Sequence, residues 1–220
     1  MRRESWILAI DGARRDQPLV LLASDRGEIA WCPEPALPEP RLVSAVAAAM
    51  KDHRGQIGRV LAVRGPGSYI GVRGGLAAGL GAAQALRRPL AMLGSLELVA
   101  AACEPAGLQP LLALADAGRG GTYGQLLELA RGAGSNSGWR PAGPAQLLGR
   151  DLGWPAAWAA AAQWTGEPGE GRALPPGLAR LDSVRDRLGA LAWAAMRRWQ
   201  PISGYDPVTA DYGETLGAER

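Results

Sequence analysis

In the first part of the chain, short apolar runs give way to segments whose apolar residues recur three and four positions apart. Three apolar runs separated by polar turns predict a meander of strands over residues 6–10, 19–24 and 28–32. Helices over residues 41–52, 72–86 and 95–103 then alternate with strands over residues 60–63 and 90–93. This order predicts an α/β fold in which helices pack against a mixed sheet.

The second part of the chain opens with a similar pattern. An apolar strand at 110–115 ends in Asp116, and residues 121–129 form its return strand, much as the strand at 6–10 ends in Asp11. The pattern then weakens, and we expect a loop at 132–138, a short helix at 144–152, a strand or helix at 156–163, a loop at 166–177, an amphipathic helix at 184–199 and an extended tail at 201–220. We therefore expect two lobes, 1–104 and a smaller 105–220 that includes the final helix.

A glycine-rich loop follows the strand at 60–63 and leads into the next helix, with the motif residues Gly65, Pro66, Gly67, Ser68, Tyr69, Gly71 and Arg73. Bare backbone N–H groups at a helix start can bind anions, and Arg64 and Arg73 would add positive charge. The loop has neither the Lys-Ser/Thr of a Walker loop nor dinucleotide-binding glycine spacing. The alternative is a tight turn without a ligand.

The helix after this loop is unusually rich in small residues. Gly71, Gly75, Gly79 and Ala83 fall four apart on one stripe, and Gly74, Ala78 and Ala82 run beside it. Each interior glycine costs about 0.5–1 kcal/mol relative to alanine, so close approach of a neighbouring backbone must compensate. Packing on the chain's own sheet explains one stripe, and a partner helix explains small residues on both flanks. We expect a partner-binding face made by Leu42, Val46, Met50, Gly71, Gly74, Gly75, Ala78, Gly79 and Ala82.

The charge, the cysteine content and the length of the apolar stretches argue against several classes of function. The formal net charge is +3, with no arginine run longer than two, so the linear sequence does not suggest direct RNA binding. Cys32 and Cys103 lie in unrelated segments and are expected to be buried thiols rather than a metal or redox pair. No apolar stretch is long enough for a membrane span and no signal-peptide core is found, so we expect a cytoplasmic protein.

Candidate catalytic residues are few. His53 is the single histidine, which leaves no transition-metal site, and we expect it to be a solvated residue at a helix end. Ser68 could be misread as a nucleophile, but His53 is the one histidine that could serve as its base. Asp11 and Asp116 have the position of phosphate-site aspartates, although a turn-forming or capping role is the simpler interpretation.

Four segments carry a family resemblance. The strand ending at Asp11, the motif from Gly65 to Ala78, residues 94–97, and residues 116–119 with Tyr123 resemble the TsaB (YeaZ) family over roughly residues 6–130. Asp11 is followed by Gly-Ala-Arg-Arg instead of the family's small Thr or Ser residues. The resemblance implies an actin-like, Hsp70-related (ASKHA) fold of two RNase H-like lobes.

The resemblance also implies a function. Members are non-catalytic partners of TsaD, which threonylcarbamoylates adenosine 37 of ANN-decoding tRNAs, together with the ATPase TsaE. The resemblance implies that the chain pairs with TsaD, or with a second copy of itself when alone, through the helices at 41–52 and 72–86. It implies no cofactor for the chain itself, because TsaD and TsaE hold the ATP and the metal. It also implies that the chain contacts tRNA only through the complex. The alternative is a stand-alone nucleotide-binding phosphotransferase or a glycoprotease-like peptidase.

Overall fold

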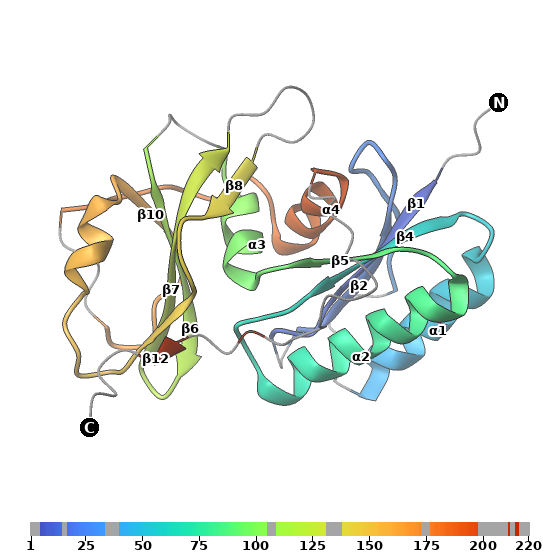
Figure 1. Ribbon diagram of the computed structural model, residues 1–220, viewed down its shortest axis with the longest axis horizontal. Coiled ribbons are helices and arrows are strands. Elements are labelled where there is room, and N and C mark those ends of the chain that lie inside the picture. Colours follow the sequence, from blue (N-terminus) through green and yellow to red (C-terminus); the bar gives the residue numbers. More distant parts are fainter. Residues whose placement is uncertain are drawn as a thin grey trace. The chain divides into compact units, whose positions relative to one another are not determined.

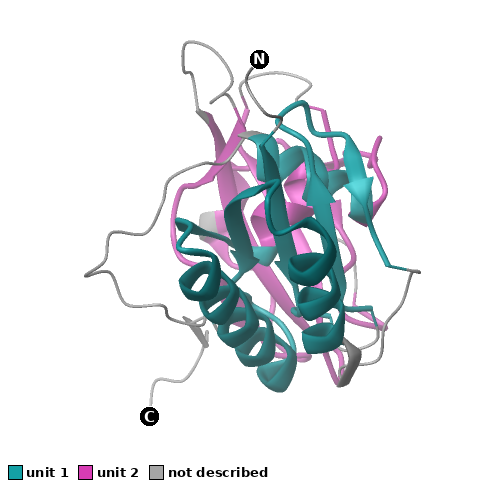
Figure 2. Cartoon of the chain, turned by 90° about the vertical axis from the view of Figure 1, so that its right-hand side faces the viewer, with its two compact units in different colours: residues 1–95, 188–211 teal, residues 96–187, 212–220 magenta. Residues whose placement is uncertain are grey.

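The chain forms two compact units in this computed structural model (Figure 2), one of residues 1–95 with 188–211 and one of residues 96–187 with 212–220. The structure describes residues 5–14, 17–33, 40–104, 109–130, 138–172, 177–197, 211 and 214–215. The expected loop at 132–138 and the expected tail at 201–220 lie largely outside these ranges.

Unit 1 is built on a five-stranded mixed sheet in the order β3-β2-β1-β4-β5 (Figure 1). Its strands are β1 (Trp6–Asp11), β2 (Leu19–Ala23), β3 (Ile29–Trp31), β4 (Ile57–Val63) and β5 (Leu90–Leu93). The first three pair antiparallel as a meander, whereas β4 pairs parallel with both β1 and β5. The near-continuous apolar runs of β1 and β4 fit this position, because a central parallel strand is covered on both faces. The predicted mixed sheet is confirmed.

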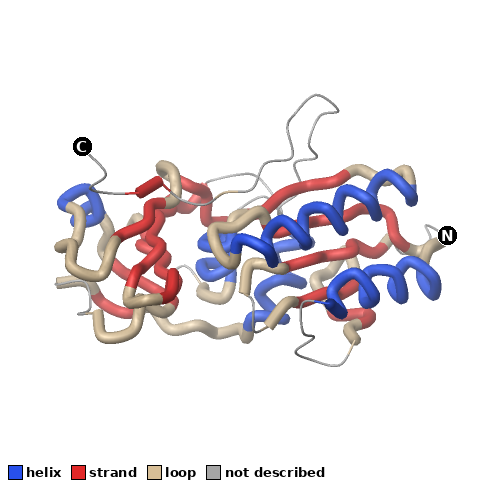
Figure 3. Tube along the Cα trace, turned by 90° about the horizontal axis from the view of Figure 1, so that it is seen from below, coloured by secondary structure: helices blue, strands red, loops and turns tan. Residues whose placement is uncertain are grey.

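Two helices cover one face of this sheet. α1 (Pro40–His53) packs on β2, and α2 (Tyr69–Leu86) packs on β1, β4 and β5. They lie side by side and run in the same direction (Figures 1 and 3). α4 (Arg187–Arg197) lies on the other face (Figure 1), where Trp193 and Met196 approach Gly27 of the β2–β3 turn. The unit is therefore a helix–sheet–helix sandwich.

Unit 2 contains the second mixed sheet, in the order β11-β10-β6-β7-β9-β12, with β8 paired to β7. Its long hairpin joins β6 (Leu111–Gly118) to β7 (Gly121–Ala130), and α3 (Ser95–Ala101) leads into the unit. The shorter elements are β8 (Gly138–Pro141), β9 (Gln146–Leu148), the 3-10 helix η1 (Ala156–Ala160), β10 (Gln163–Gly166), β11 (Ala179–Arg180) and β12 (Glu214–Thr215). Leu111, Leu127 and Trp139 belong to one core cluster of this unit, and Leu112, Leu114, Trp158 and Trp164 to another.

Two expectations differ from the structure. Residues 144–152 form strand β9 and turns instead of a short helix, because Gln146–Leu148 pairs with β7 and tertiary pairing overrides local preference. The final helix was expected in the C-terminal lobe, but most of α4 belongs to unit 1, which differs from a simple division after residue 104. Its apolar face, with Leu191, Ala192 and Ala195 fully buried, covers a sheet distant in sequence.

Candidate functional site

The glycine loop between β4 and α2 is packed against the chain itself. Gly65 has φ +101°, and its carbonyl accepts a 2.7 Å hydrogen bond from the Ser95 N–H. A Cβ on Gly67 would lie 2.3 Å from the Ala13 carbonyl oxygen, which accepts a 2.7 Å bond from the Ser68 N–H. The glycines thus allow the loop to pass close to the end of β1, as a structured lead-in to the helix.

The start of α2 is capped from within the chain. Ser68 is the N-cap, and its side-chain oxygen accepts a 3.3 Å bond from the Gly71 N–H, one of the donors that an anion would need. On the first turn, Arg73 Nη1 donates to the Tyr69 hydroxyl, and its guanidinium lies 4.9 Å from the Tyr69 ring centroid. Both side chains are exposed, so this pair forms part of the outer surface.

The small-residue stripe of α2 faces the chain's own sheet. Gly71, Gly75, Gly79 and Ala82 are buried, and a Cβ on Gly79 would lie 2.9 Å from the Ala62 Cβ of β4. A Cβ on Gly75 would lie 3.2 Å from the Gly12 nitrogen. The expectation that these four residues bind a partner is therefore wrong, because their closely approaching neighbours are β1 and β4.

Two expected contacts on α1 are also wrong for the same reason. Leu42 and Val46 are 4% and 5% exposed, so they belong to the core of unit 1 and cannot reach another protein. Met50 is half-buried. Only the residues of the expected set that keep some exposed surface, Met50, Gly74 and Ala78, stay candidates for partner contact.

The outer faces of the two helices carry apolar residues that sequence reasoning missed. Val43 of α1 is 62% exposed and Ile70 of α2 is 65% exposed. Ala77 and Gly81 are exposed beside Gly74, and a Cβ on Gly74 or Gly81 would meet no atom within 4 Å. We call Val43, Ile70, Gly74, Ala77 and Gly81 the outer helical face. A helical projection of α2 could have found Ile70, Gly74, Ala77 and Gly81, because they lie on the flank opposite the buried Val72 and Leu76.

The two strand-end aspartates make equivalent turns. Asp11 Oδ1 accepts a 2.8 Å bond from the Ala13 N–H, and Asp116 Oδ1 accepts a 2.8 Å bond from the Gly118 N–H. Asp11 is buried and Asp116 is exposed. Each carboxylate therefore has the turn-forming role that aspartate commonly takes.

Ser68 and His53 cannot act as a catalytic pair. Arg54, next to His53, donates a 2.9 Å bond from Nη2 to the Ala85 carbonyl at the far end of α2. From Ser68 to Ala85 the helix rises about 26 Å, at about 1.5 Å per residue. His53 is also not simply solvated: its half-buried ring lies 5.4 Å from that of Trp6 and 5.9 Å from that of Trp31.

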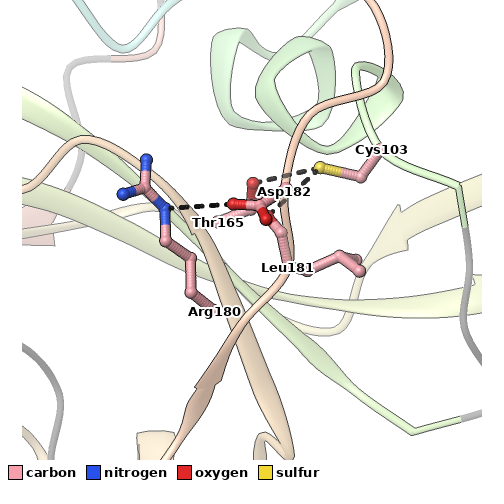
Figure 4. A network of polar contacts seen from close by, with 5 residues as sticks. All are labelled: Cys103, Thr165, Arg180, Leu181 and Asp182. Carbon is pink, nitrogen blue, oxygen red and sulfur yellow. Dashed lines mark hydrogen bonds and ion pairs between the residues drawn. The ribbon is translucent and has the colours of Figure 1, made fainter.

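The two thiols differ in environment. Cys103 is fully buried, as expected, with Sγ 3.0 Å from Thr165 Oγ1 and 3.8 Å from the Leu181 carbonyl (Figure 4). Cys32 is half-buried rather than buried, and burial raises the pKa of its thiol. Within the described ranges, no group of three or more His, Cys, Asp or Glu side chains could hold a metal ion.

Among the residues that the structure describes, no helix is long and apolar enough to cross a bilayer. The candidate functional feature of unit 1 is the outer helical face, where Val43 and Ile70 are exposed.

Comparisons with known proteins agree with this picture. Residues 39–133 match a family model described as TsaD, tRNA N6-adenosine threonylcarbamoyltransferase. YeaZ from Pseudomonas aeruginosa superposes with a TM-score of 0.59 and 23% identity, over 94% of this chain and 98% of that one. A protein described as uncharacterised with similarity to peptidase YeaZ, from Pseudomonas aeruginosa, gives a TM-score of 0.52 and 26% identity, over 73% of this chain and 74% of that one. No curated protein sequence matches.

Two mixed sheets flanked by helices, together with these matches, place the chain in the actin-like α/β class that includes YeaZ and TsaD. The family-model match over residues 39–133 and the structural likeness to YeaZ agree with the resemblance to the TsaB (YeaZ) family that the glycine motif indicates.

Proposed function

We propose that this chain is a non-catalytic subunit in the threonylcarbamoylation of tRNA adenosine, and that it binds TsaD through the outer helical face. Similarity to YeaZ and to the TsaD family supports a role in this tRNA modification. TsaE would join through TsaD, and the chain would need no cofactor of its own. The alternative, a peptidase with Ser68 as nucleophile and His53 as its base, is disfavoured because the length of α2 keeps these two residues apart.

The outer helical face is the observation that supports a protein partner. Val43 and Ile70 expose large apolar side chains, and Gly74, Ala77 and Gly81 leave part of the exposed surface of α2 without large side chains. Small residues allow another helix to approach closely, and each large apolar side chain buried at an interface contributes about 1.5–3 kcal/mol. In the absence of TsaD, the same face would pair two copies in an isologous homodimer.

A matched pair of substitutions tests this surface. Val43 in α1 and Val184 in unit 2 are both 62% exposed, so Val43→Glu and Val184→Glu make the same chemical change on different surfaces. Val43→Glu should weaken association with TsaD on the order of tenfold to a hundredfold, because a carboxylate would be buried without a partner. Val184→Glu should leave association unchanged. Titration calorimetry with purified TsaD measures both.

Association of TsaD with both variants at wild-type affinity would show that this face is not the interface. Peptide cleavage or ATP hydrolysis by the purified chain, lost on changing Ser68 or Asp11, would contradict the non-catalytic assignment. Formation of modified tRNA by TsaD and TsaE without this chain would contradict its role in the reaction.

A further inference from the structure

Positively charged side chains gather at one end of unit 1, where both surface helices end. Lys51 is in the last turn of α1, Arg54 follows that helix, and Arg87 and Arg88 follow α2. All four are exposed. We call these residues the basic edge. They come from two segments more than thirty positions apart, so no basic run in the sequence indicates them.

Backbone contacts hold the two segments together. Arg54 Nη2 donates a 2.9 Å bond to the Ala85 carbonyl, two residues before Arg87. The Val60 N–H donates a 3.0 Å bond to the Pro89 carbonyl, directly after Arg88. The C-terminal ends of α1 and α2 accordingly lie at the same end of the sheet, at the right of Figure 1.

Helix-end electrostatics account for only part of this cluster. Cations stabilise a helix C-terminus, which is sufficient to explain Lys51 and Arg54. Arg87 is different, because it occupies the left-handed C-cap of α2 with φ 52°, a position that glycine normally fills. The cap geometry of α2 therefore does not explain why this position carries an arginine.

Within the two segments of the basic edge, basic residues outnumber acidic ones. Asp52 is the one carboxylate within residues 51–59 and 84–89, and the whole chain carries a formal net charge of +3. Asp25 and Glu28 lie in the β2–β3 turn, at the end of the sheet where β1 begins, because Ala23 pairs with Ile7. In the sheet order, β1 and β4 lie between β2 and β5, the strand that follows Arg87 and Arg88. The surface therefore presents an excess of positive charge over a short stretch.

Aromatic rings lie next to this charge. The ring of His53, between Lys51 and Arg54 in sequence, lies near those of Trp6 and Trp31, and all three side chains are half-buried. Basic side chains combined with accessible aromatic rings are typical of surfaces that bind nucleic acid, where phosphates meet the cations and bases stack on the rings. This combination favours RNA over an acidic protein.

We propose that the basic edge contacts the phosphodiester backbone of tRNA, independently of its sequence. The proposal rests on the proposed function, since it supplies the substrate of that reaction, and it replaces the expectation that tRNA is contacted only through the complex. Guanidinium and ammonium groups bind phosphate through charge-assisted hydrogen bonds and release its counterions. Binding by the isolated chain is expected to be weak, with a Kd of about 10⁻⁴–10⁻⁶ M at physiological salt.

Paired variants with equal charge loss test the proposal. Arg87→Gly/Arg88→Gln removes two charges from the basic edge, and glycine suits the left-handed backbone of Arg87, so folding should be retained. Arg119→Gly/Arg140→Gln is the control, because Arg119 has φ 54° and both residues are exposed on unit 2. Fluorescence anisotropy with a labelled unmodified tRNA transcript, from about 50 to 200 mM salt, measures binding, and thermal melting checks folding.

The wild type and the control should bind the transcript with equal affinity and equal salt dependence. The basic-edge variant should bind more weakly, and its slope of log K against log salt should be shallower by about 1.5, as for two lost phosphate contacts. Equal binding by the variant and the control, or no binding by the wild type, would overturn the proposal.

Titration of the same proteins with TsaD separates this proposal from the proposed function. If the basic-edge variant binds both TsaD and tRNA as the wild type does, only the proposed RNA contact is overturned. Failure of the wild type to bind TsaD would count against the proposed function instead. A variant that loses TsaD but still binds tRNA would assign the basic edge to a protein contact and contradict the proposal.

Discussion

Gly12 and Gly71 lie so close that neither position has room for a side chain. A Cβ built on Gly12 would fall 2.2 Å from the Gly71 carbonyl oxygen, and one built on Gly71 would fall 2.1 Å from that of Gly12. This reciprocal contact joins the end of β1 to the first turn of α2. The close approach explains why glycines recur on the buried stripe of α2, although each glycine lowers the intrinsic stability of the helix.

Gly71→Ala should destabilise unit 1 strongly. The added methyl group would collide with backbone, which cannot move aside as a flexible side chain could, so we expect a loss of at least about 2–3 kcal/mol in the free energy of unfolding. Urea denaturation followed by tryptophan fluorescence measures the loss. Wild-type stability of this variant would show that α2 does not approach β1 so closely.

Gly74→Ala, on the same helix, should have the opposite effect. A Cβ at Gly74 meets no atom within 4 Å, so the variant gains helix propensity without a clash. We expect about 0.5–1 kcal/mol of added stability, read from the same denaturation curves. Destabilisation would mean that Gly74 is covered within the isolated chain, and the outer helical face would then lose this member.

The pair shows what the sequence could reveal about this helix. Its four-residue glycine spacing predicted a close approach, because glycine in a helix interior needs compensation. Spacing alone does not tell which side of the helix faces the sheet, so Gly71, Gly75 and Gly79 were expected at a partner interface. The side is set by β1 and β4, whose own residues approach the stripe.

How well the strands and helices of each unit could be predicted depended on the local pattern of apolar and polar residues. The sheet of unit 1 was predictable because its strands are apolar runs separated by clear turns and helices. In unit 2, Gln146–Leu148 is too short to show an alternating pattern, and it becomes strand β9 through pairing with β7. The basic edge was missed because only the fold brings the segment of Arg54 next to the end of α2, where Arg54 bonds the Ala85 carbonyl.

Arg172 holds a turn of unit 2 in place. Its Nη1 donates to the carbonyls of Gly149 and Arg150 at 2.7 and 3.2 Å, its Nη2 donates to the Leu152 carbonyl, and its guanidinium lies 4.6 Å from the Trp154 ring centroid. Burial lowers the pKa of this guanidinium, in agreement with its packed position.

Replacing Arg172 should therefore loosen the turn at residues 149–154. Arg172→Met keeps the apolar stem but leaves the carbonyls without their charged donor, and we expect a loss of about 1.5–3 kcal/mol in the free energy of unfolding. Hydrogen exchange should rise within this turn, whereas the exposed Arg140→Met control should change little. Unchanged exchange in the turn would show that these contacts contribute nothing to its order.

Cys32 should titrate above the ordinary pKa of a thiol, because its half-buried position disfavours the thiolate. The thiolate is the form that attacks, so alkylation of the folded chain by iodoacetamide should be slower near pH 8.5 than alkylation of a model thiol. The rate should continue to increase at higher pH. The Cys32 thiol has a lower pKa in the unfolded chain than in the folded chain, so the unfolded chain loses the thiol proton first as the pH rises. The contribution of Cys32 to the free energy of unfolding is therefore complete below the unfolded-state pKa and is lost as the pH rises through the folded-state pKa. Mass spectrometry of the Cys32 peptide measures the profile, with a Cys103→Ala background removing the second thiol. A midpoint at or below that of the model thiol would contradict the burial of Cys32.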